Sequence, residues 1–164
     1  MKYFYWLALT AVLLSQTACA GSTEEGFKKI MASKTAPVGV VFEIATGDDT
    51  GLDWAIPAVR SYTSRLRERF PGIKIAVVSH GDEQFQLMES NRQRFPDTHR
   101  RVASLIQDQN ITVHVCGNHA ASNGVDDDEF IETIDVAARG PAQVDTYEEA
   151  GYEVLVIYRP EKVK

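Results

Sequence analysis

Short apolar runs rich in β-branched residues recur along this chain, and they constrain its fold more than any other feature. Residues 38–44, 73–78 and 111–116 are mostly apolar and stop at polar or glycine-containing turns. Such runs are typical of strands buried on both faces, as in parallel sheets. Residues 152–158 repeat the pattern near the end of the chain, and residues 131–137 indicate a less regular fourth strand.

Segments with helical periodicity separate these strands. In the first segment Leu52, Ile56, Val59 and Leu66 recur at helical spacing, and Asp53 is the expected N-cap. Further helices are expected near residues 97–106 and 144–150. Alternating strands and helices joined by right-handed crossovers predict an α/β fold. We expect a three-layer α/β/α sandwich with a mostly parallel sheet of about five strands.

The first 20 residues have the features of a signal peptide. Lys2 precedes a short apolar run over residues 7–14, and Ala18-Cys19-Ala20 fits the small-x-small cleavage pattern. We expect cleavage after Ala20 and an exported, periplasmic protein. The alternative is a lipid on Cys19, as in bacterial lipoproteins, which would anchor the chain to a membrane. Gln16 departs from the aliphatic residue usual at that place in lipoprotein signals.

The rest of the chain is predicted to contain one domain. Residues 21–37 are polar with little periodicity and are interpreted as a linker or flexible arm, so that the α/β domain covers residues 38–160. The formal net charge of −6 is opposite to the basic footprint of nucleic-acid-binding proteins, and no nucleic-acid partner is expected. The loop at residues 46–51 lacks the signatures of phosphate-binding and dinucleotide-binding loops.

Candidate site residues follow two of the predicted strands. Cys116 ends the strand at residues 111–116, directly before Gly117-Asn118, and His80 follows the strand at 73–78. Ligands of open α/β sheets collect outside the carboxyl ends of the strands. With the leader removed, Cys116 is the remaining thiol, which indicates a reactive or intermolecular cysteine or a buried structural one. Backbone N–H groups of the Gly117-Asn118 turn could hold an anion there, and His119 could donate a proton.

The order of these features resembles the DsrE/DsrF-like family of small sulfur-relay proteins over about residues 38–160. The resemblance is carried by Val77-Val78-Ser79-His80-Gly81, Val115-Cys116-Gly117-Asn118 and the Gly140-Pro141 break before the last helix and strand. It implies that Cys116 accepts sulfane sulfur as a persulfide, with His80, Asn118 and His119 as neighbours. It also implies sulfur donor and acceptor proteins or small sulfane-sulfur compounds as partners, and a homo-oligomer.

Two other functions remain open at this stage. His114-x-Cys116-x-x-His119, with His80, offers nitrogen and sulfur ligands that suit zinc or copper, although the spacing matches no recognised closed zinc site. A non-catalytic binding or assembly module is the other alternative, because a fold does not imply a function. For the preferred sulfur carrier or sulfurtransferase component we expect no cofactor and no resident metal.

Overall fold

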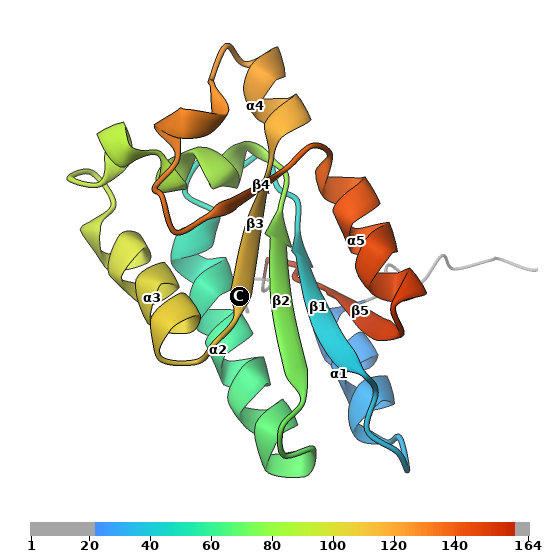
Figure 1. The fold of residues 1–164 in the computed structure, drawn as a ribbon. Helices are drawn as coiled ribbons and strands as arrows, with labels where there is room; N and C mark the ends of the chain where they lie inside the picture. The colour runs from blue at the N-terminus through green and yellow to red at the C-terminus, as the bar shows by residue number, and fades with distance from the viewer. Residues whose placement is uncertain (1–21, 160–164) are drawn as a thin grey trace, which may run out of the picture.

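A five-stranded parallel sheet forms the centre of the computed structural model, which describes residues 22–159 (Figure 1). The strands are β1 (Gly39–Ile44), β2 (Lys74–Ser79), β3 (Thr112–Cys116), β4 (Asp135–Ala137) and β5 (Tyr152–Val156). Their order is β4-β3-β2-β1-β5, and every neighbouring pair is parallel. The predicted α/β fold is therefore confirmed. The leader, with Cys19, and Pro160 lie outside the described residues.

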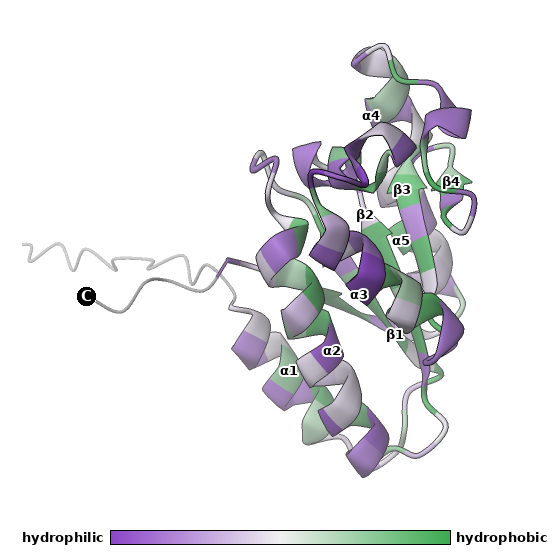
Figure 2. Ribbon diagram, turned by 90° about the vertical axis from the view of Figure 1, so that its left-hand side faces the viewer, coloured by the Kyte–Doolittle hydropathy of each residue, from purple (hydrophilic) through white to green (hydrophobic). Residues whose placement is uncertain are grey.

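Helices cover both faces of the sheet. On one face lie α1 (Thr23–Met31), α2 (Leu52–Arg69) and α3 (Pro96–Gln107), which are nearest the viewer in Figure 2. On the other face α5 (Gly140–Glu149) packs against β1, β2, β3 and β5. A short helix α4 (Gly117–Ser122) follows β3, and three short 3-10 helices are η1 (Asp82–Leu87), η2 (Glu89–Asn91) and η3 (Asp127–Glu129).

The segment interpreted as a linker over residues 21–37 contains helix α1, so that interpretation is wrong for this part. Ser22 and Glu25 form a capping box that starts the helix. Phe27 and Ile30 lie on one helical face and are buried in the main core. The hydroxyl of Thr23 accepts the N–H of Tyr158 and donates to the Val156 carbonyl, which ties α1 to the last strand. Helix α1 is thus part of the folded domain.

Two further boundaries differ from the sequence prediction. The fourth strand is confined to β4, because Ile131 and Ile134 pack into the core ahead of it instead of extending it. Asp53 does not cap α2, whose N-cap is Gly51. The Asp53 carboxylate instead accepts hydrogen bonds from the Gln86 amide and the Thr98 hydroxyl.

Alternation along the strands divides the side chains between the two faces. The main core lies under α1, α2 and α3 and contains most of the large buried side chains, among them Phe42, Leu66 and Leu105. A much smaller cluster beneath α5 contains Val41, Ala76, Val78 and Val144. No helix among residues 22–159 is long and apolar enough to cross a membrane.

Candidate functional site at the carboxyl edge of the sheet

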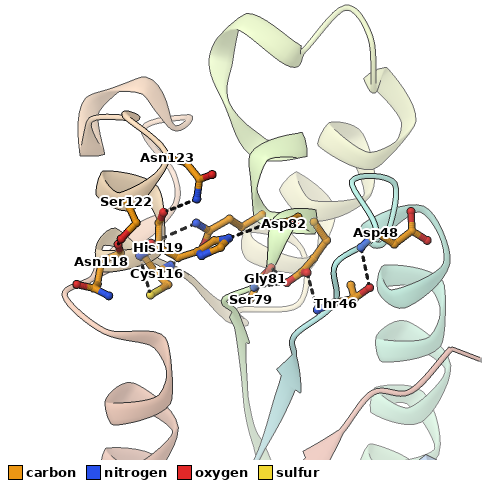
Figure 3. Close-up of polar contacts among 12 residues, drawn as sticks. Thr46, Asp48, Ser79, Gly81, Asp82, Cys116, Asn118, His119, Ser122 and Asn123 are labelled. Carbon is orange, nitrogen blue, oxygen red and sulfur yellow. Dashed lines mark hydrogen bonds and ion pairs between the residues drawn. The ribbon is translucent and has the colours of Figure 1, made fainter.

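Cys116 lies at the junction of β3 and α4. It is the last residue of the strand and the N-cap of the helix, and its side chain is buried. The sequence predicted a loop after the strand, but a helix begins at Gly117 instead. Because the chain turns directly into a helix, the Cys116 thiol takes the place of a capping side chain, and its Sγ accepts the backbone N–H of His119 at 3.4 Å (Figure 3).

The two residues after Cys116 do not form the expected anion-binding turn. The N–H of Asn118 donates to the Ala138 carbonyl at 3.0 Å, so it points to the neighbouring chain segment. Gly117 is packed tightly: a Cβ there would lie 3.1 Å from an Asp127 carboxylate oxygen and 3.2 Å from a Val136 methyl carbon. Glycine thus allows close packing against the end of β4. The N–H group that contacts sulfur is that of His119.

The imidazole of His119 extends away from the sulfur toward the loop after β2. Its Nε2 lies 3.0 Å from Oδ1 of Asp82, as drawn in Figure 3. The ring also stacks on Phe85, with centroids 5.4 Å apart. Backbone and side chain of His119 therefore have separate roles, since the N–H contacts Sγ while the ring links α4 to η1.

His80 is the neighbour of Cys116 across two adjacent strands. The β2–β3 register pairs Ser79 with Val115, so the next positions along the strands are His80 and Cys116. Both pack against Gly140 at the start of α5, where an added Cβ would overlap His80 and lie 3.3 Å from Cys116 Cβ. The structure therefore brings His80 and Cys116 together as expected, although it records no hydrogen bond between the imidazole and Sγ.

Glu43 of β1 is paired with His80, and the sequence interpretation did not single it out. Its Oε1 lies 2.8 Å from Nε2 of His80, and the two side chains are 22% and 15% exposed. Because a carboxylate accepts, Nε2 donates and Nδ1 is left as the second nitrogen of the ring. Glu43 is the charged residue of an otherwise apolar strand, and this was the signal that could have identified it.

Gln84 is a second residue that sequence reasoning missed. It is fully buried in η1, and its amide binds the main chain of Cys116 at both ends. Oε1 accepts the Cys116 N–H at 2.8 Å, and Nε2 donates to the Cys116 carbonyl at 3.2 Å. This pair of bonds holds the cysteine backbone as a neighbouring strand would. A buried glutamine in a short polar segment has no sequence signature that separates it from an exposed one.

Glu83, the residue before Gln84 in η1, links the loops that follow β1 and β2. Its carboxylate accepts the hydroxyl of Ser79 at 2.7 Å and the N–H groups of Gly81 and Thr46 at 3.0 and 2.8 Å. Three hydrogen bonds satisfy a carboxylate that is otherwise withdrawn from water. The carboxyl edge of the sheet is therefore held by side chains of η1, which contact the segments on both sides of it.

His114 lies deeper on the Cys116 face and packs as a core residue. Its Nε2 lies 2.9 Å from the hydroxyl of Tyr147 in α5. Burial lowers the pKa of His114, because removal from water disfavours the charged imidazole, while Asp135 acts in the opposite direction. His114 is thus held in its neutral form beneath the site.

Each histidine suggested for a metal site is paired with another side chain and does not share a ligand set with Cys116. His114, His119 and His80 are hydrogen-bonded to Tyr147, Asp82 and Glu43 respectively. Within residues 22–159, no group of three or more His, Cys, Asp or Glu side chains is arranged to hold a metal ion. The geometry thus supplies a thiol with a backbone donor and a histidine–carboxylate pair beside it.

Comparison with known proteins agrees with this architecture. Among solved structures the chain is similar to MTH1491 of Methanobacterium thermoautotrophicum, a protein described as of unknown function, with a TM-score of 0.57 and 20% identity over 71% of this chain and 96% of that one. It is also similar to YchN of E. coli, with a TM-score of 0.50 and 13% identity over 73% of this chain and 98% of that one. No curated protein sequence matches the chain.

A family model identifies the chain more closely than these structural likenesses, which concern the fold alone. The model of the DsrE/DsrF-like family matches residues 20–157, which include every strand of the sheet and Cys116. The predicted resemblance is therefore confirmed, and the chain belongs to the DsrE/DsrF-like family.

Proposed function

We propose that this protein accepts sulfane sulfur on Cys116 and carries it as a persulfide. Membership in the DsrE/DsrF-like family suggests a role of the sulfur-relay type. The observation that supports Cys116 as the carrier is the His119 N–H directed at its Sγ. Such a donor can stay bonded to sulfur while the thiolate becomes a persulfide, one of the reversible states of cysteine. Partners are sulfur donors and acceptors, either proteins or small sulfane-sulfur compounds.

The backbone around Cys116 is held firmly enough for this role. Gln84 fixes the main chain of the cysteine on one side, and the Asn118 N–H bond to Ala138 fixes the first turn of α4 on the other. Sulfur transfer needs one thiolate, an approach for the donor and little else from the protein. The site therefore combines a fixed main chain with a sulfur atom at the carboxyl end of β3.

Intact mass spectrometry tests the proposal. The purified wild-type protein is incubated with cysteine persulfide, and we expect a gain of one sulfur atom that a reductant removes. Cys116→Ser should fold normally and gain none. A wild-type protein whose thiol is alkylated by iodoacetamide but which takes up no sulfur would contradict the proposal and favour a non-catalytic binding module. One equivalent of zinc or copper in the mass, lost in His114→Ala and His119→Ala, would favour the metal-binding alternative.

The same spectrum tests the proposals about export and anchoring. A mature chain that starts at Gly21 supports cleavage after Ala20 and a periplasmic location, whereas a lipid mass on Cys19 supports an anchored protein. We also propose a homo-oligomer, since α5 alone covers one face of the sheet and the short edge strand β4 is open to further pairing. Sedimentation that shows only monomer at micromolar concentration would contradict it.

A further inference from the structure

We propose that His80, oriented by Glu43, protonates the group that leaves the sulfur donor when Cys116 is persulfidated. The inference rests on the proposed function and adds a catalytic residue, a positioning residue and a class of donor to it. The donor is an alkyl persulfide, R–S–SH, whose leaving thiolate is basic and needs a proton. An acid beside the accepting sulfur would supply that proton.

The register of the sheet brings the three residues together. Cys116, His80 and Glu43 come from the ends of β3, β2 and β1, three adjacent parallel strands. All three side chains lie on the α5 face, because His80 and Cys116 both pack on Gly140 and Glu43 reaches His80. Glu43 lies on the far side of His80 from Cys116. The imidazole therefore lies between a fixed carboxylate and the reacting thiol.

The hydrogen bond to Glu43 determines which nitrogen of His80 reacts. Nε2 donates to the carboxylate at 2.8 Å, so Nδ1 is the atom that gains and loses the proton. Neighbouring titratable groups leave this assignment intact: His114 is bonded to Tyr147 of α5, and Asp82 is bonded to His119 on the opposite side of the site. His80 is thus the histidine beside Cys116 that has a fixed orientation and a nitrogen left for the donor.

The absence of a bond between His80 and Sγ suits an acid that acts on the donor. In an in-line attack the leaving sulfur lies beyond the sulfur being transferred, away from Sγ. The Cys116 thiolate attacks the terminal sulfur, the donor S–S bond breaks, and the leaving thiolate takes the Nδ1 proton. The balance is Cys116–S⁻ + R–S–SH + His80–H⁺ → Cys116–S–SH + R–SH + His80.

Two reagents with different leaving groups test this role. Cysteine persulfide releases a basic thiolate, whereas methyl methanethiosulfonate modifies the same thiol and releases a sulfinate that needs no proton. His80→Gln is expected to slow sulfur uptake from the persulfide about 100-fold, the scale of general acid catalysis, and to leave the thiosulfonate rate nearly unchanged. Glu43→Gln should show a smaller loss with the same selectivity.

The pH profile gives an independent readout. Uptake by the wild type and uptake by His80→Gln should differ in their pH dependence, because only the wild type carries an acid beside Cys116. Tyr147→Phe is the matched control, since it removes a histidine hydrogen bond on the same face but away from Cys116, and it should leave both rates unchanged.

The outcomes separate this inference from the proposed function. If His80→Gln slows the reactions with both reagents equally, or slows neither reaction, the proposed role of His80 is overturned. Sulfur uptake by the wild type would still support a persulfide carrier in that case. A wild type that reacts with the thiosulfonate and takes no sulfur from the persulfide would overturn both. If His80→Gln fails to fold, the rates of Glu43→Gln with the two reagents are compared instead. A Glu43→Gln variant whose persulfide reaction is not selectively slowed would overturn the proposal.

Discussion

The two faces of the sheet differ in thickness and in chemistry. Under α1, α2 and α3 lies the large apolar core, whereas α5 covers a cluster of only four buried apolar residues. Four ionisable side chains lie on the α5 face, where Glu43, His80, His114 and Cys116 follow one another from β1 to β3. The face under α1, α2 and α3 therefore supplies most of the stability, and the face under α5 can tolerate the polar groups that a site requires.

The largest difference between the faces is expected in stability. Phe27→Ala removes a fully buried ring from the core beneath α1 and should lower the free energy of unfolding by about 3–5 kcal/mol. Val144→Ala on the α5 side should cost about 1–2 kcal/mol. Urea denaturation monitored by circular dichroism measures both. A Phe27→Ala variant as stable as the wild type would mean that α1 is a dispensable arm after all.

A smaller effect is expected from the buried glutamines of η1. Gln84→Leu leaves the N–H and carbonyl of Cys116 unpaired and should cost about 2 kcal/mol of unfolding free energy. Gln86→Leu is the matched control, because Gln86 accepts the Leu52 N–H at the start of α2, away from the thiol. Both variants should lose stability, but only Gln84→Leu should change the iodoacetamide alkylation rate of Cys116. An equal rate change in both would contradict a local role for Gln84.

The smallest effect concerns pH and compares one buried histidine from each face. Burial lowers the pKa of His99 on α3 and of His114 on β3 below the ordinary value of 6.5. The unfolded chain therefore binds protons more readily than the folded one as the pH falls below 6.5, and stability should decrease in that range. His99→Gln and His114→Gln should each reduce this decrease in urea titrations. A wild-type stability that is constant across this range would contradict the expected sign.

The sequence predicted the centre of the sheet because β1, β2 and β3 are buried on both faces. Continuous apolar runs such as residues 38–44 need no knowledge of their neighbours to be identified as strands, and the alternation with helices implies parallel pairing. Helix α1 was missed although Ser22 and Glu25 form a capping box and Phe27, Ile30 and Met31 recur at helical spacing, since the segment is only nine residues long and mostly polar. The helix after Cys116 was missed because glycine and asparagine favour loops when no packing partner is known.

What the sequence determined by itself is the fold class, the family and the position of Cys116 at the end of a strand, because these depend on local patterns of residues along the chain. The tertiary structure decided which groups surround that cysteine. Strand register places His80 beside it and Glu43 beside His80, and η1 brings Gln84 to its main chain from 32 positions away. These contacts join residues that are distant in sequence, and they form only when the sheet and its loops pack together.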